Sequence, residues 1–455
     1  MSLEPAISRL PANFLFGVAT SSYQIEGVDF GGCGPSHWDD FAAEAGRISD
    51  GSDGAQACDH YHRFAEDLDL VRDGGFGAYR FSFSWPRLLP ESDQVVNPEG
   101  LAFYDRLLDA MLARDLRPFA TLYHWDLPRR HANVGGWRNR DIAGWFADYT
   151  DLVMRHFGDR LEFIAPVNEP WCVSWLSHYW GHHAPGLCDL GATAKAMHYV
   201  QLAHGRSIEV MRGHGHQNLG CVLNKEFAVP VDDTRLAAEK THLFDGIYSR
   251  WFEESIFKGR YPQEVLAIFE GHMPAGYEDD LAMISAPLDW VGSNYYTRSV
   301  IQPDSEEPHI GFRCVRGKLA KTDMGWEIDP EGLSFFLRRL ASDYAPGLPQ
   351  YVTENGMAND DHVTDDGPDG AVAVHDRQRT DYFAAHLAQI EKLCAEGVPM
   401  KGYFAWSLLD NYEWAFGYSK RFGIVHVDYD SMVRTPKDSY HAWRKALKGR
   451  ARYLR

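Results

Sequence analysis

Short apolar runs alternate eight times along the chain with longer segments in which apolar residues recur every three or four positions. The short runs are rich in β-branched and aromatic residues, which favours strands, whereas the longer periodicity is typical of helices. The expected strands cover residues 15–20, 79–85, 118–124, 163–169, 219–223, 288–296, 350–354 and 401–408. The expected helices follow them at 60–72, 101–114, 143–157, 192–211, 235–257, 331–342, 377–394 and 440–447.

Eight strand and helix pairs, with no linker and no change in composition between them, predict an α/β fold. We expect one domain over residues 1–455, a closed (β/α)8 TIM barrel with long βα loops. The longest polar interruptions, 302–321 and 359–374, follow the sixth and seventh strands. Loops in that position lie at the face where such barrels place their active sites.

The chain is acidic, with 45 basic and 64 acidic side chains and a formal net charge of −19. This charge argues against nucleic acid or an anionic membrane surface as a partner. The seven cysteines never form a Cys-x-x-Cys pair, which indicates reduced thiols rather than a disulfide framework or a zinc site. Without a leader-like N-terminus or an apolar stretch of membrane-spanning length, we expect a cytoplasmic protein, either monomer or homo-oligomer.

Two of the expected strands end in a glutamate. Glu169 follows the apolar run 163–167 and precedes Pro170, and Glu354 ends the run 350–354 before Asn355 and Gly356. A strand-end carboxylate is often only part of a solvated turn. Two carboxylates that converge from separate strands, however, suit hydrolysis of a glycosidic bond, which needs one protonated and one ionised carboxyl group.

Other expected strands end in residue types that bind a sugar. A pyranose has an apolar face and a rim of hydroxyl groups, so it suits aromatic platforms and amide, carboxylate or imidazole partners. Each such residue alone has a structural explanation, as an ion pair or core filler, but the joint pattern favours a sugar site. The candidates are Gln24, Arg80, His124, Trp125, Asn168, Asn294, Tyr296, Trp406, Glu413 and Trp414. We expect Arg80 and Tyr296 to lower the pKa of Glu354, and a neighbouring carboxylate to raise that of Glu169.

The segments Asn168-Glu169-Pro170 and Thr353-Glu354-Asn355-Gly356 resemble the two catalytic signatures of glycoside hydrolase family 1, the β-glucosidase family. The resemblance extends from residues 14–17 to 420–425. It implies that Glu169 is the acid/base and Glu354 the nucleophile, with carboxyl groups about 5–5.5 Å apart, a covalent glycosyl-enzyme and retention of configuration. It implies no metal and no organic cofactor. It also implies nucleophile support from Arg80, Asn294 and Tyr296, and sugar binding by Gln24, His124, Trp125, Asn168, Trp406, Glu413, Trp414 and Phe422.

The substrate implied by this resemblance is a β-glucoside or a short oligosaccharide. Relatives that act on 6-phosphoglycosides replace the pair at 413 and 414, whereas Glu413 is present here and its charge would repel a 6-phosphate. The resemblance places Trp171, Cys172, Leu176 and Trp326 on the aglycone side. For Cys172, packing on a helix face is an equally good interpretation.

Three alternatives stay open from the sequence. His60 and His62 form a His-x-His motif, but they lie at an expected helix start, which argues against a metal site. A non-catalytic sugar-binding barrel is disfavoured because both carboxylates are present. A transglycosidase would use the same intermediate, and the sequence separates neither that activity nor glucose from galactose or fucose.

Overall fold

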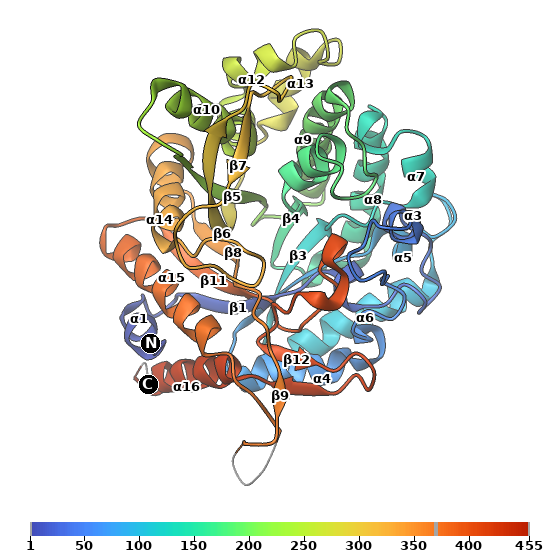
Figure 1. Ribbon diagram of the computed structural model, residues 1–455. Helices are drawn as coiled ribbons and strands as arrows, with labels where there is room; N and C mark the ends of the chain where they lie inside the picture. Colours follow the sequence, from blue (N-terminus) through green and yellow to red (C-terminus); the bar gives the residue numbers. More distant parts are fainter. Residues whose placement is uncertain (1, 368–371, 454–455) are drawn as a thin grey trace.

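The computed structural model describes residues 2–367 and 372–453. Eight parallel strands form the central sheet (Figure 1): β1 (Leu15–Ala19), β2 (Ala78–Ser82), β3 (Arg117–Tyr123), β4 (Phe163–Val167), β5 (Gly220–Pro230), β6 (Trp290–Pro303), β8 (Gln350–Asn355) and β11 (Met400–Trp406). Their order is β4-β3-β2-β1-β11-β8-β6-β5. The ends of this series meet, because Ile164 bridges Leu219 and Asn168 bridges Val222. The sheet therefore closes into the expected barrel.

Helices cover the outside of the barrel (Figure 1). The longer ones are α4 (His60–Gly74), α6 (Pro98–Leu112), α8 (Ile142–Phe157), α9 (Leu190–Gly213), α10 (Arg235–Asp245), α14 (Pro330–Arg339), α15 (Arg377–Ala395) and α16 (Asp438–Tyr453). Shorter ones are α1 (Glu4–Arg9), α2 (Ser22–Ile25), α3 (His37–Ala43), α5 (Trp85–Leu88), α7 (Arg129–Asn133), α11 (Trp251–Lys258), α12 (Gln263–Ile268) and α13 (Tyr277–Ile284). Within residues 2–367 and 372–453, no helix is both long and apolar enough to cross a membrane.

The side chains of each strand point alternately to the outside and the inside of the barrel, which gives two apolar layers. On β2, Tyr79 and Phe81 join the large cluster between strands and helices, while Ala78 belongs to a smaller cluster inside the barrel. Successive side chains of a strand point to opposite faces, so Arg80 also faces inward. Aromatic rings fill the interior, with Phe119 stacked on Phe163 at a centroid distance of 4.2 Å and 4.7 Å from Phe404.

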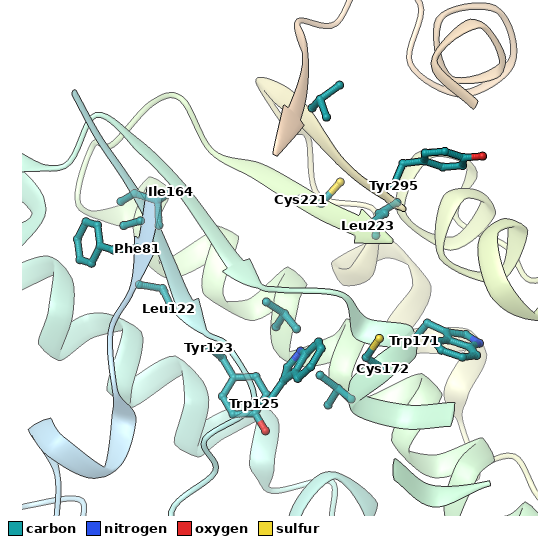
Figure 2. Packing of buried hydrophobic residues seen from close by; sticks show 14 of the residues in the cluster. Phe81, Leu122, Tyr123, Trp125, Ile164, Trp171, Cys172, Cys221, Leu223 and Tyr295 are labelled. Carbon is teal, nitrogen blue, oxygen red and sulfur yellow. The ribbon is translucent and has the colours of Figure 1, made fainter. Parts of the chain in front are cut away.

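Part of the outer cluster appears in Figure 2. Phe81, Leu122 and Ile164 lie together on neighbouring strands, and Trp171 and Cys172 lie on the segment that follows β4. Cys172 begins a π-helical turn there, Cys172–Leu176, and Trp171 precedes it. The outer layer thus reaches the loops that carry the candidate site.

Several expected boundaries were wrong. β6 continues to Pro303 and pairs antiparallel with β7 (Phe312–Val315), so the expected loop 302–321 contains a hairpin, in which Ile301 and Phe312 are buried. Trp85 is not a strand residue; it begins α5, where the Ser84 hydroxyl accepts a hydrogen bond from the Arg87 amide. A π-helical turn at Gly246–Arg250 interrupts the expected helix 235–257, and another at Leu340–Tyr344 ends the expected helix 331–342.

Short strands lie among the remaining loops. β9 (Val363–Thr364) pairs with β10 (Ala373–Val374) within the expected loop 359–374, of which residues 368–371 lie outside the described residues. β12 (Val425–Val427) pairs with β13 (Arg434–Pro436). The first and last helices, α1 and α16, lie side by side (Figure 1), and Arg450 donates hydrogen bonds to the carbonyl oxygens of Ile7 and Leu10.

Candidate active site

The two glutamates predicted from the strand ends lie at the carboxyl ends of β4 and β8. Glu354 is part of β8, and Glu169 follows β4 with a left-handed φ of 49°. The amide of Glu169 donates to the carbonyl oxygen of Val222 on β5, at 3.1 Å. A positive φ is uncommon for a residue with a side chain and is retained where the surrounding structure enforces it. Barrel closure here fixes the backbone of Glu169.

Glu354 is buried and contacts a cation directly. Arg80 Nη1 lies 2.5 Å from its Oε1, and the Tyr296 hydroxyl donates to its Oε2 at 2.6 Å. Burial nevertheless raises the pKa of Glu354, while Arg80 and Tyr296 act in the opposite direction. The expectation of a pKa below the ordinary value was therefore wrong, because desolvation outweighs the two partners that stabilise the carboxylate.

Glu169 is also buried, but its two direct partners are neutral. Asn294 Nδ2 donates to Oε1 at 2.6 Å, and Cys172 Sγ lies 3.1 Å from Oε2. Burial and then the charge of Glu354 raise the pKa of Glu169 to about 8. The expected direction is confirmed, although burial is a larger cause than the neighbouring carboxylate that suggested it.

A chain of hydrogen bonds with a fixed direction connects the two glutamates. Arg80 can only donate, and its Nη2 lies 2.7 Å from the side-chain oxygen of Asn168. That oxygen also accepts from Asn294 Nδ2 at 3.0 Å, and the same Nδ2 donates to Glu169. Thr353 donates to the remaining oxygen of Asn294 at 2.7 Å. The orientation of both amides therefore follows from the guanidinium of Arg80.

The same chain of hydrogen bonds determines which nitrogen of His124 carries the proton. Asn168 Nδ2 lies 3.2 Å from His124 Nε2, and because the amide nitrogen donates, Nε2 must accept. Burial and the positive charge of Arg80 lower the pKa of His124 well below its ordinary value. The ring is thus neutral, with its proton on Nδ1.

A cavity of about 800 Å³ opens above the two glutamates. Most of the predicted site residues line it: His124, Trp125, Glu169, Trp171, Cys172, Leu176, Tyr296, Trp326, Glu354, Trp406, Glu413, Trp414 and Phe422. Gln24, Arg80, Asn168 and Asn294 lie behind this lining. Gln24 is fully buried, where its Nε2 donates to Asn411 and to the carbonyl oxygen of Tyr412, both at 2.9 Å.

Many rings of the cavity lining contact one another. Trp125 and Trp414 lie 4.7 Å apart between centroids, and His124 is stacked with Trp406 at 5.8 Å. Trp326 lies 5.6 Å from Tyr296 and 6.0 Å from Phe422. Trp125 and Trp414 both have positive φ, 81° and 49°. Strained backbone at several cavity residues is typical of a functional site.

Glu413 is the third carboxyl group of the cavity. Its Oε2 is buried and has no hydrogen-bond partner among the described residues. Burial, followed by the charges of Glu354 and Glu169, raises its pKa to about 8. At neutral pH Glu413 is therefore mainly the neutral acid, contrary to the expectation of a charged side chain.

A buried ion network holds the loop that carries Glu413, Trp414 and Phe422. Asp410 accepts from Lys437 at 2.6 Å, from Arg421 at 2.8 Å and from the amide of Gly423 at 2.9 Å. Lys437 also contacts Asp361, which follows β8, at 2.6 Å. Charged groups buried this deeply are paired, and their pairing fixes the loop relative to the barrel.

Some of the cavity lining was not predicted. It includes Phe41, Arg47, Trp180, His183, Asn224, Glu226, Tyr248, Ser299 and Phe416. The sequence pattern could have located Asn224 and Glu226. They follow the apolar run 219–223, just as the predicted site residues follow the other expected strands. The rest lie on other loops or elements, which the strand pattern does not locate. The two histidines of the His-x-His motif are elsewhere in α4, where His60 contacts Asp67 and His62 contacts Asp59.

Comparison with known proteins assigns this fold and site to a family. The family model described as Glycosyl hydrolase family 1 matches residues 6–450. The chain therefore belongs to glycosyl hydrolase family 1 and is an enzyme of that class.

Individual relatives are similar over almost the whole chain. Beta-glucosidase A of Thermotoga maritima is 43% identical over 97% of this chain and 98% of its own length. A bifunctional beta-D-glucosidase/beta-D-fucosidase of Bifidobacterium breve is 41% identical over 96% and 98%. The structure of the Thermotoga maritima beta-glucosidase in complex with deoxynojirimycin superposes with a TM-score of 0.92 at 42% identity, covering 97% of this chain and 99% of that one.

Proposed function

We propose that the protein is a retaining β-glucosidase that hydrolyses terminal non-reducing β-D-glucosyl residues from β-glucosides and short cello-oligosaccharides. The observation that carries the proposal is the unequal environment of the two buried glutamates. Glu354 contacts the Arg80 guanidinium, whereas the direct partners of Glu169 are an amide and a thiol. A contacting cation favours the ionised form, and burial beside a carboxylate favours the neutral one. Glu354 is thus suited to be the nucleophile and Glu169 the acid.

In the first step, an oxygen of ionised Glu354 attacks the anomeric carbon and forms an ester bond. The bond from that carbon to the aglycone oxygen breaks, and Glu169 gives its proton to the departing oxygen. Arg80 and Tyr296 hold Glu354 from two sides, and burial together with Glu354 raises the pKa of Tyr296, so that it stays a donor. Both contacts fix the carboxylate in position before attack.

In the second step, Glu169 is ionised and removes a proton from water. The water oxygen attacks the anomeric carbon, the ester bond breaks and Glu354 leaves as a carboxylate. Two inversions give net retention of the β configuration. Glu169 regains its proton, so the cycle needs no metal and no organic cofactor.

The cavity lining supports a glucosyl unit above the pair. Trp406 is suited to stack on the apolar face of the sugar, and His124, Trp125, Glu413 and Trp414 are suited to bind its hydroxyl groups. Asn168 lies just behind this lining and contacts His124, and Gln24 holds the segment Asn411-Tyr412 that leads to Glu413. Phe422 lies beside Tyr296 in the lining. We assign Trp171, Leu176 and Trp326 to the aglycone side of the same cavity.

The state of Glu413 changes the argument against phosphorylated sugars. A neutral Glu413 does not repel a phosphate by its own charge, as the sequence suggested. A 6-phosphate would still enter a region with three buried carboxyl groups, where the guanidinium of Arg80 is already bonded to Glu354. We therefore propose a neutral sugar, and a turnover preference for a 6-phosphoglucoside would contradict this.

A second activity, on β-D-fucosides, is favoured by the likeness to the bifunctional enzyme of Bifidobacterium breve. Transfer to a sugar acceptor would use the same glycosyl-enzyme, and product analysis distinguishes it from hydrolysis.

We also propose that the whole chain is one catalytic unit. Its location is cytoplasmic in this proposal, since all seven cysteines are unpaired and suit a reducing compartment.

The test compares wild type, Glu354→Ala and Glu169→Ala on an activated aryl β-D-glucoside, with EDTA present throughout. Both variants should lose several orders of magnitude in turnover. Added azide can replace the missing nucleophile in Glu354→Ala and should give the α-glucosyl azide. In Glu169→Ala, azide should attack the glucosyl-enzyme and give the β-glucosyl azide.

Glu91→Gln, at an exposed glutamate outside the cavity, is the matched control and should behave as wild type. Exchanged azide products would mean that the two roles are reversed. A wild type inactive on every β-glycoside would contradict the proposal and favour a sugar-binding barrel without catalysis.

A further inference from the structure

Cys172 contacts the carboxyl group that we propose as the acid. It lies one turn after Glu169, and its backbone amide donates to the Glu169 carbonyl oxygen at 3.0 Å. Its Sγ approaches Glu169 Oε2 at 3.1 Å. The side chain is 7% exposed and lines the cavity. Simple packing on a helix face, one of the two interpretations from the sequence, does not account for this contact.

The direction of the hydrogen-bond chain identifies the oxygen that carries the acid proton. Arg80 fixes the side-chain oxygen of Asn168, and that oxygen fixes the amide of Asn294. Asn294 therefore donates to Glu169 Oε1. The carbonyl oxygen of a carboxylic acid accepts a hydrogen bond better than its hydroxyl oxygen, so this contact favours the neutral acid with its proton on Oε2, the oxygen that Cys172 contacts.

We propose that Cys172 is a positioning residue that holds the proton-bearing oxygen of Glu169 through both steps of the reaction. The inference rests on the proposed function of Glu169. While Glu169 is an acid, the sulfur contact holds Oε2, and with it the acid proton, in one orientation. When Glu169 is ionised and acts as base, the thiol donates its hydrogen to Oε2.

The thiol suits this double role because it is a permanent but weak donor. Burial, and then the Glu169 charge, raise the pKa of Cys172 well above its ordinary value, so the sulfur stays protonated. A strong donor would stabilise the carboxylate and weaken the acid needed in the first step. An apolar side chain would leave Oε2 without a partner when Glu169 is ionised.

The other titratable and charged groups that face Glu169 come from several elements around the cavity and are themselves retained in a Cys172 variant. They are Arg80, Tyr248, Tyr296, Glu354 and Glu413, and Glu226 faces Cys172. A change in the titration of Glu169 on substitution of Cys172 therefore reports the sulfur contact.

The experiment measures the pH dependence of kcat/KM on cellobiose, whose poor leaving group needs the acid. The basic limb reports the acid in the free enzyme. Cys172→Ser introduces a stronger donor and should move this limb to lower pH, by about 0.5 to 1 unit. Cys172→Ala and Cys172→Val remove the donor and should move it to higher pH by a similar amount.

Ala is smaller than Cys and Val is larger. A packing effect would therefore move the basic limb differently in the two variants, whereas the inference requires the same shift in both. Cys221→Ala, at a buried cysteine of β5, is the matched control and should leave the basic limb unchanged. An unchanged limb in all Cys172 variants, or one that follows side-chain size, would overturn the inference. If Cys172→Ser does not fold, the basic limbs of Cys172→Ala and Cys172→Val, compared with that of wild type, still test the inference. Wild-type turnover without a basic limb would instead mean that Glu169 is not the acid.

Discussion

Replacement of Arg80 by methionine tests the electrostatic basis of the site most directly. The change keeps an unbranched apolar stem but removes a guanidinium that contacts Glu354 at 2.5 Å and Asn168 at 2.7 Å. The side chains of Arg80 and Glu354 are 2% and 4% exposed. Loss of one partner from so buried a pair costs about 3–5 kcal/mol, because the other charge is left without compensation.

The remaining glutamate can avoid this cost by taking up a proton. Since one pKa unit corresponds to about 1.4 kcal/mol, the pKa of Glu354 should rise by a further 2 to 4 units, roughly. Arg80 at present opposes the upward effect of burial, so its removal acts in the same direction as burial. At pH 7 we therefore expect kcat/KM to fall by about 100-fold or more, because little of the nucleophile is ionised.

The assay is kcat/KM on an aryl β-D-glucoside from pH 4 to 10, with Arg80→Lys beside Arg80→Met. The acid limb should move to higher pH in Arg80→Met and less in Arg80→Lys, which keeps the charge but not the two-pronged contact. A fall in rate at every pH with an unmoved acid limb would refute the reasoning. It would show that Arg80 acts through geometry alone.

Two further predictions concern stability. Because burial raises the pKa of Glu169 from 4.5 to about 8, the carboxyl group should make folding progressively less favourable as the pH rises from about 4.5 to 8, by a few kcal/mol in total. Glu169→Gln does not titrate, so its melting temperature should match wild type near pH 4.5 and exceed it at pH 8; a constant difference would contradict this. Gly356→Ala would place a Cβ 1.8 Å from the carbonyl oxygen of Trp406, so calorimetry should show a large loss of stability. Its control, Gly213→Ala, faces open space at the end of α9 and should be neutral or slightly stabilising.

Much of the architecture could be predicted because it follows from repeated local patterns. The two apolar periodicities located all eight barrel strands and the helices between them, and the strand ends brought Glu169 and Glu354 together. The boundaries of β6 could not be predicted in this way. Its extension pairs with β5 as far as Ile301 and with β7, which contributes Phe312 across from Pro303, and pairing between strands is a property of the tertiary structure.

Charge states were predicted less well than positions. Residue identity suggested that Arg80 and Tyr296 would control Glu354, but burial has the larger effect on its pKa. Residue identity also suggested that Glu413 would be charged, but burial raises its pKa to about 8. The sequence shows which partners are available, whereas the amount of water removed from a carboxyl group depends on how the loops close over it.

Both ends of the chain contribute to the wall of one cavity, and this has a consequence for biosynthesis. β1 lies between β2 and β11, and Gln24 contacts Asn411 and Tyr412, almost 400 residues further along the chain. Lys437, just before α16, secures the loop through Asp410. A nascent chain that has left the ribosome only as far as β8 therefore has both of the glutamates proposed as catalytic but no closed barrel to hold them. Sugar binding must await translation of the segment from β11 to Lys437.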